Sequence, residues 1–266
     1  MSATFPINHD LHCHTSLSLC CREADFTPQV VYEHAKNHGY SAVCITNHFW
    51  DANIPGANDY YSAQNLEHIK QALPLPHDDK LRVMFGCEAE YRGGKNLGVT
   101  PEIYDEFDII VIPVNHFHQK FVFPGVFQSP EEINELFLTR FEELLELDLP
   151  WQKIGLAHLN STKHLKEFPY TMTQLNEDRL REVFRRVSEY GAGVELNAAF
   201  FSEVWQENGS LRLFQIAKEE NCKFYCASDA HTRDGLKRIS ERLGKAAEML
   251  GLTADDLFMP VSCHYN

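Results

Sequence analysis

The sequence Asp10-Leu11-His12-Cys13-His14 lies near the start of the chain, behind a short apolar lead. Side chains two residues apart in a β-strand point to the same face. If this stretch is a strand, His12 and His14 project together, and two imidazoles on one face can bind one metal ion. A single His-x-His pattern also occurs by chance, so its meaning depends on where other ligand-type residues fall.

The composition is that of a folded, acidic protein. The chain has 266 residues, of which 44% are hydrophobic and 23% are charged, a balance typical of globular domains. Its net charge of −14 argues against broad electrostatic binding to nucleic acid or to an anionic membrane. A small anionic substrate stays compatible with this charge, because bound metal ions can make one pocket positive.

We find no sign of membrane insertion or export in the sequence. No apolar run approaches the roughly 20 residues that span a bilayer, and no basic region followed by an apolar one precedes Asp10. The eight cysteines form no C-x-x-C pair, which is typical of reduced thiols and predicts a cytoplasmic protein. The oligomeric state cannot be predicted.

Seven apolar runs of strand length alternate with helical patterns. The predicted strands cover residues 7–14, 41–46, 81–87, 107–114, 153–157, 192–196 and 223–227. The predicted helices cover 28–37, 62–72, 129–147, 173–190, 210–220 and 236–250, with one more turn at 253–256. Such strand–helix units indicate an α/β fold of parallel βαβ repeats. With no linker or composition break, we expect one domain over residues 1–266.

Histidine or carboxylate side chains stand at or just past the ends of these strands. They are His12, His14, His48, Glu88, His116, His158, Asp229 and His231. In a (β/α) barrel the carboxyl ends of the strands meet at one face. Imidazole and carboxylate are ligands of zinc, manganese and iron, and this many ligands would suit two or three ions.

Two further residues near the strand ends leave alternatives open. His118 follows His116 by two positions and could replace it as a ligand. Glu195 lies inside the sixth strand, and we expect it to orient a ligand by hydrogen bonding rather than to bind metal itself.

The ordered set of motifs resembles one known family. The segments Asp10-Leu-His-Cys-His-Thr15, Ile45-Thr-Asn-His48, Gly86-Cys-Glu88, Val114-Asn-His116, Ala157-His158, Val194-Glu-Leu-Asn197 and Ser228-Asp-Ala-His231 are similar in order and spacing to those of the polymerase and histidinol phosphatase (PHP) family. The resemblance runs from about residue 8 to residue 255. It implies a distorted (β/α)7 TIM-like barrel that holds a trinuclear metal centre.

The resemblance also implies a set of ligands. His12, His14, Glu88 and Asp229 would bind a first metal, and Glu88 would bridge to a second metal bound by His116 and His158. A third metal would take His48, His231 and the residue six past His14. That residue is commonly a histidine in trinuclear members and is Cys20 here. Cys20 could bind as a thiolate, which would favour zinc, or leave the third site weak or empty; Cys21 is the alternative ligand.

The implied activity is hydrolysis of a phosphate ester. Divalent ions bind the phosphoryl group and lower the pKa of a bound water. Asp229 or His231 would transfer the proton, and Arg92 or Arg233 would stabilise the phosphoryl oxygens unless they are ordinary surface arginines. We expect a phosphatase for a small phosphomonoester, with histidinol phosphate as a candidate because one branch of the family acts on it.

Two aromatic segments are candidates for the pocket that would bind the alcohol portion of the substrate. The aromatic residues within 117–127 and the loop with Phe200, Phe201 and Trp205 would shape this pocket or simply cap the barrel.

Three other functions compete with the phosphatase. A nuclease of the same family is disfavoured by the net charge. An amidohydrolase would normally carry a lysine at the end of the fourth strand, and the sequence has none there. A non-catalytic metal-binding domain predicts lost ligands, whereas at most one has changed.

Overall fold

Seven parallel strands form one sheet in the order of the sequence, as the βαβ pattern predicts. The computed structural model describes residues 3–161, 168, 171–201 and 209–261. The strands are β1 (His9–Cys13), β2 (Ala42–Phe49), β3 (Arg82–Ala89), β4 (Ile109–Pro113), β5 (Ile154–Ala157), β6 (Gly193–Asn197) and β7 (Lys223–Ala227). The prediction of a (β/α)7 TIM-like barrel is confirmed. One domain over the whole chain stays a prediction.

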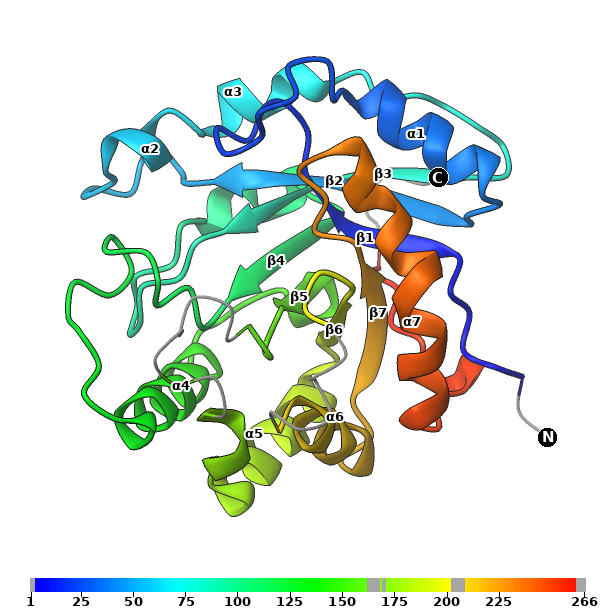
Figure 1. Cartoon of the computed structure of the whole chain (residues 1–266). Coiled ribbons are helices and arrows are strands. Elements are labelled where there is room, and N and C mark those ends of the chain that lie inside the picture. The colour runs from blue at the N-terminus through cyan, green and yellow to red at the C-terminus, as the bar shows by residue number, and fades with distance from the viewer. Residues whose placement is uncertain (1–2, 162–167, 169–170, 202–208, 262–266) are drawn as a thin grey trace.

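The longer helices flank the sheet on its outer side, and the short helix Asp59–Ser62 lies beyond the carboxyl end of β2 (Figure 1). The helices are α1 (Pro28–Asn37), α2 (Asp59–Ser62), α3 (Leu66–Ile69), α4 (Pro130–Leu144), α5 (Glu177–Tyr190), α6 (Ser210–Glu219) and α7 (Arg238–Met249). Short 3-10 helices cover Lys70–Ala72, Pro101–Glu106, Trp151–Lys153, Thr171–Gln174, Arg233–Lys237 and Ala254–Asp256. None of the described helices combines the length and apolarity that crossing a bilayer requires.

The single helix predicted over 62–72 is wrong, and the reason is local capping. The side chain of Asn58 accepts a hydrogen bond from the backbone of Tyr61, and Asn65 accepts one from His68. Asparagine favours the position just before a helix, so Asn65 starts a new short helix where the apolar spacing suggested continuity. The helix predicted from residue 173 begins at Glu177 for the same reason, with Asn176 as its cap.

The barrel closes between β1 and β7 through a short bridge and two side chains. The backbone of His14 donates to Ala230 O at 3.1 Å, and that of Asp229 donates to His12 O at 2.9 Å. Buried backbone N–H groups need acceptors.

Side chains supply those acceptors farther along the seam. His9 Nε2 accepts from the backbone of Cys226 at 2.8 Å, and Asp10 Oδ1 accepts from that of Ser228 at 3.0 Å. Burial lowers the pKa of His9 to about 4 and so keeps its ring neutral and able to accept. The seam fixes the end of β1, which carries His12, directly against the end of β7.

Candidate metal centre

The strand ends bring all eight predicted histidine and carboxylate ligands together. His12 lies in β1 and His14 just beyond it, while His48 and Glu88 lie near the ends of β2 and β3. His116, His158, Asp229 and His231 follow β4, β5 and β7. Two of these positions have left-handed backbone, His158 with φ 30° and Asp229 with φ 50°. Such conformations are uncommon outside glycine and cluster at functional sites.

The ligand atoms fall into three overlapping groups. Within each group, one ligand atom from every member lies within 4.8 Å of the others. The groups are His12 with His14 and Glu88, Glu88 with His116 and His158, and His14 with His48 and His231. Glu88 and His14 each belong to two groups, so three ions bound here would be close neighbours.

The second group equals the ligand set that the resemblance implies for the second metal, and the first contains three of the four ligands implied for the first metal. The third group holds His14 beside His48 and His231, whereas the resemblance implies Cys20 or Cys21 as the further ligand. Asp229 stands beside the first group, with Oδ1 at 3.3 Å from His14 Nε2 and 3.9 Å from His12 Nε2.

The nitrogen and oxygen atoms of the site are arranged as ligands of cations and not as hydrogen-bond partners of one another. The Nε2 atoms of His12 and His14 face each other at 3.1 Å, as do those of His116 and His158. Glu88 Oε2 lies within 3.6 Å of ring nitrogens of His12, His14 and His48, yet it accepts no hydrogen bond from a described residue. Buried polar atoms seldom stay unpaired, and converging imidazole nitrogens with a carboxylate form a typical divalent-metal site.

The charges of the site are set by mutual contact. Burial favours neutral acids, but His48 and His12 hold the pKa of Glu88 well below its usual range. Burial also opposes protonation of His12, yet Glu195 and Glu88 hold the pKa of that imidazole well above its ordinary value. A divalent ion would compete with protons for these ligands, so we expect metal binding to strengthen as pH rises.

Glu195 is placed to orient two of the histidines, as the sequence suggested. Its Oε2 lies 2.7 Å from His12 Nδ1 and accepts from the Tyr225 hydroxyl at 2.9 Å. Its Oε1 accepts from the backbone of His158 at 3.0 Å and from Asn197 Nδ2 at 2.7 Å. The carboxylate thus directs the Nε2 atom of His12 into the site.

Glu90 orients His116 in a similar way, and we did not predict this role from the sequence. Its Oε2 lies 2.8 Å from His116 Nδ1 and accepts a hydrogen bond from the Tyr61 hydroxyl. Glu90 follows Glu88 by two positions, just past the end of β3, and the period of two in extended backbone is the signal that could have found it. His118, the alternative to His116, lines the cavity with its ring centroid 5.3 Å from that of His116 but belongs to no ligand group of the described residues.

The structure distinguishes the two neighbouring cysteines. Cys20 lines the cavity beside His231 and His48. Burial opposes ionisation of its thiol, but these two histidines outweigh burial and lower the pKa of Cys20 to about 5. Cys21 instead donates its S–H to the backbone oxygen of His231 at 3.0 Å. Geometry therefore favours Cys20 over Cys21 as a thiolate ligand.

Neither of the two predicted catalytic arginines lines the cavity. Arg92 donates from Nε to Phe121 O at 2.8 Å and stacks its guanidinium 4.3 Å from the Phe121 ring centre. Arg233 pairs with the carboxylates of Asp25 and Glu23 on the surface. Local spacing from His231 could not reveal these partners, which lie more than 200 positions away in the sequence. The arginine that does line the cavity is Arg238.

A cavity of about 350 Å³ opens above the ligand groups. Tyr60, Gln119, Ser161, Phe200 and Thr232 form part of its wall. The phenylalanines of 117–127 pack among themselves and their neighbours, as Phe123 does on Phe127 with ring centres 4.3 Å apart, and they do not line this cavity. The sequence prediction for Phe200 fits the wall; Trp205 lies outside the described residues.

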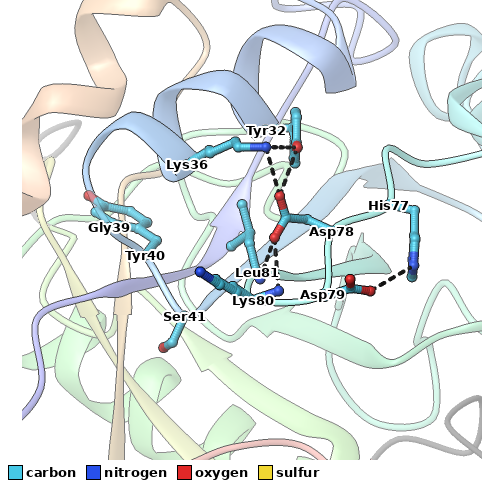
Figure 2. A pocket seen from close by; sticks show the side chains of 10 residues that line it. All are labelled: Tyr32, Lys36, Gly39, Tyr40, Ser41, His77, Asp78, Asp79, Lys80 and Leu81. Atoms are coloured by element: carbon cyan, nitrogen blue, oxygen red, sulfur yellow. Dashed lines mark hydrogen bonds and ion pairs between the residues drawn. The ribbon is translucent and has the colours of Figure 1, made fainter.

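A second cavity, of about 760 Å³, lies at the opposite ends of β2 and β3 (Figure 2). Charged groups of its wall form ion pairs and hydrogen bonds with other residues of the same wall. Lys36 Nζ pairs with Asp78 at 2.8 Å and bonds the Tyr32 hydroxyl, while Asp78 accepts from the backbone of Lys80. This end of a barrel normally serves stability rather than chemistry.

The fold and these side chains define an α/β barrel with a multi-metal site at the carboxyl ends of its strands. A model of the PHP domain matches residues 10–199. The chain belongs to this family, as its motifs predicted.

Two solved structures are similar over most of the chain. One is a histidinol phosphate phosphatase from Lactococcus lactis subsp. lactis Il1403 complexed with zinc, L-histidinol and phosphate, with a TM-score of 0.54 and 15% identity over 90% of this chain and 93% of that one. The other is a proposed histidinol phosphatase from Listeria monocytogenes, with a TM-score of 0.57 and 14% identity over 85% of this chain and 96% of that one. At these identities the likeness supports the fold. No curated protein matches the chain.

Proposed function

We propose that this protein is a metal-dependent phosphatase that hydrolyses a small phosphomonoester to an alcohol and inorganic phosphate. The observation that carries the proposal is the set of three overlapping ligand groups that share Glu88 and His14. Membership of the PHP family supports it. The site would bind two or three divalent ions, with zinc, manganese and iron all compatible with imidazole and carboxylate ligands.

The residues divide into ligands, orienting groups and proton carriers. His12, His14, Cys20, His48, Glu88, His116, His158, Asp229 and His231 would hold the ions. When bound, the ions would supply positive charge to the phosphoryl oxygens and hydroxide near neutral pH. Glu195 and Glu90 keep His12 and His116 in the required orientation. Asp229 or His231, whichever is not bound to an ion, would move a proton to the leaving oxygen from the cavity wall.

A small substrate suits the cavity. Its volume of about 350 Å³ accommodates a compact phosphorylated metabolite. Histidinol phosphate is one candidate, because the Lactococcus lactis relative was solved with L-histidinol and phosphate. A nuclease remains the weaker alternative, since the chain has a net charge of −14 and the described cavity wall offers one arginine to a nucleic-acid backbone. Location in the cytoplasm stays a prediction from the sequence.

The first test is hydrolysis of para-nitrophenyl phosphate with controlled metal content. We expect activity in the metal-loaded protein and a loss of at least about a hundredfold after chelation, because the ions carry much of the transition-state stabilisation. Activity should return on adding zinc, manganese or iron(II). Absence of turnover at every metal loading with para-nitrophenyl phosphate, with histidinol phosphate and with phosphomonoesters that carry a second anionic group would refute the phosphatase and favour a non-catalytic metal-binding domain.

Cys20→Ser tests the departure of the third ligand set from the family pattern. The low pKa of Cys20, about 5, keeps a thiolate available at neutral pH, so we expect its loss to lower the metal content by about one ion per chain. Elemental analysis of purified protein measures this. Cys21→Ser is the matched control, because that thiol bonds a backbone oxygen. Equal metal content in all three proteins would show that Cys20 is not a ligand.

A further inference from the structure

The charged groups of the cavity are unevenly distributed. Among the described residues of its wall, Arg238 is the one lysine or arginine, and Glu88 and Asp229 are the only carboxylates. Both carboxylates contact the histidines, with Glu88 Oε1 3.2 Å from His158 Nε2 and Asp229 Oδ1 3.3 Å from His14 Nε2. Neither is free to bind a positive group of a substrate.

A tight turn holds Arg238 beside the end of β7. Arg238 is the first residue of α7, and the turn before it contains the buried Gly235. A Cβ atom on Gly235 would lie 3.0 Å from Cβ of Ala230 and 3.5 Å from Nη1 of Arg238. Because glycine has no side chain, the turn can pack directly against Ala230, the residue between Asp229 and His231. The guanidinium of Arg238 lies next to this contact.

Arg238 has no acceptor of its own in the described part of the chain. Its side chain is half-buried, and no described residue accepts a hydrogen bond from the guanidinium or pairs with its charge. Its neighbours differ: Arg233 pairs with Asp25 at 2.9 Å, and Arg242 donates to Ala198 O at 3.0 Å. A partly desolvated guanidinium without a partner is a receptor for an anion, because its planar donors match carboxylate and phosphate oxygens.

We propose that Arg238 binds a second anionic group, a carboxylate or a second phosphate, on the alcohol portion of the substrate. The inference rests on the proposed phosphatase function, in which the metal centre takes the phosphoryl group. A cationic alcohol would meet the guanidinium and find no spare carboxylate among the described wall residues, which is costly in a partly desolvated cavity. Phosphomonoesters with a second anionic group should therefore be better substrates than esters of amines such as histidinol.

Matched ester pairs and the variant Arg238→Met test this specificity. One pair is 2-phosphoglycerate and glycerol 2-phosphate, which differ by a carboxylate; the other is propane-1,3-diol bisphosphate and its monophosphate. In at least one pair, we expect the metal-loaded wild type to show a kcat/KM about tenfold or more higher for the ester that carries the second anionic group. Arg238→Met should lower that preference by about 10- to 100-fold, with less than about a threefold change for the two esters that lack the second anionic group.

Arg233→Met is the control, because it removes the same charge from the same turn outside the cavity; its preference should equal that of the wild type. Equal losses of kcat/KM by Arg238→Met on all four esters would mean that Arg238 binds the phosphoryl group, and unchanged kcat/KM values on all four would mean that it binds no part of the substrate. Either result overturns the proposal, as does a wild-type preference for histidinol phosphate over both anionic esters.

Calorimetric titration with the same esters separates this inference from the phosphatase proposal. If the wild type hydrolyses none of them, the phosphatase function fails. If the esters with a second anionic group then bind Arg238→Met about tenfold more weakly than the wild type, Arg238 is still supported as an anion site. Equal binding to the two proteins would refute it.

Discussion

Glu88→Gln is expected to lower phosphatase activity by at least about a thousandfold and to remove at least one metal ion per chain. Glu88 belongs to two of the three ligand groups and is 2% exposed. The amide of glutamine has nearly the same shape but no negative charge and one oxygen instead of two. It cannot bridge two cations, and the loss of an electrostatic group in a desolvated site typically costs about 10²–10³ in rate before any loss of metal is counted.

Activity on para-nitrophenyl phosphate, elemental analysis and circular dichroism measure the effect of Glu88→Gln. Glu33→Gln makes the same change at an exposed position of α1 and should behave as the wild type. Full metal content with activity within about tenfold of the wild type would exclude Glu88 as a shared ligand. A variant that fails to fold would be replaced by Glu88→Asp, which keeps the charge but shortens its reach, and which should retain structure while losing metal.

Glu195→Gln is expected to weaken metal binding by about 10- to 100-fold and to lower the free energy of unfolding by about 3 kcal/mol. Glu195 is fully buried, and its two oxygens together meet four donor groups. A glutamine must turn its NH2 group toward either His12 and Tyr225 or His158 and Asn197. Donors then face donors, and the His12 ring loses the carboxylate that orients it.

Tyr225→Phe separates the two parts of this prediction. It removes a single hydrogen bond to the same carboxylate and should cost about 1 kcal/mol of stability with little change in metal affinity. Chemical denaturation and metal titration of both variants give the comparison. If Glu195→Gln binds metal as the wild type does, its carboxylate does not orient His12 for coordination.

The fold was predictable because its signals are local and repeated. Six of the seven strands are short apolar runs with a histidine or carboxylate at or just past their ends, and the helices between carry their own start and stop residues, such as Pro28 at the start of α1 and Gly39 just past its end. The one wrong helix, at 62–72, failed where Asn65 could serve either as an interior residue or as a cap. Hydrophobic spacing does not distinguish these, because a cap acts through one hydrogen bond to the backbone.

The arginines show the limit of sequence spacing at the site. Arg92 and Arg233 stand close to Glu88 and His231 in the chain, yet their side chains turn to Phe121 and to Asp25. Arg238, seven positions past His231, reaches the cavity because the turn at Gly235 packs closely against Ala230. A long flexible side chain can point in many directions, and its partners decide which one it takes.

The α/β class, the seven strand–helix units and the types of ligand at the carboxyl ends of the strands could all be predicted from the amino-acid sequence. These follow from backbone periodicity, which fixes where a strand ends and which face each residue takes. Three relations appear only in the folded chain: His14 lies with His48 and His231, Glu90 contacts His116 from behind, and Arg238 lines the cavity. Those relations depend on how separate loops pack across the barrel mouth, which no local pattern encodes.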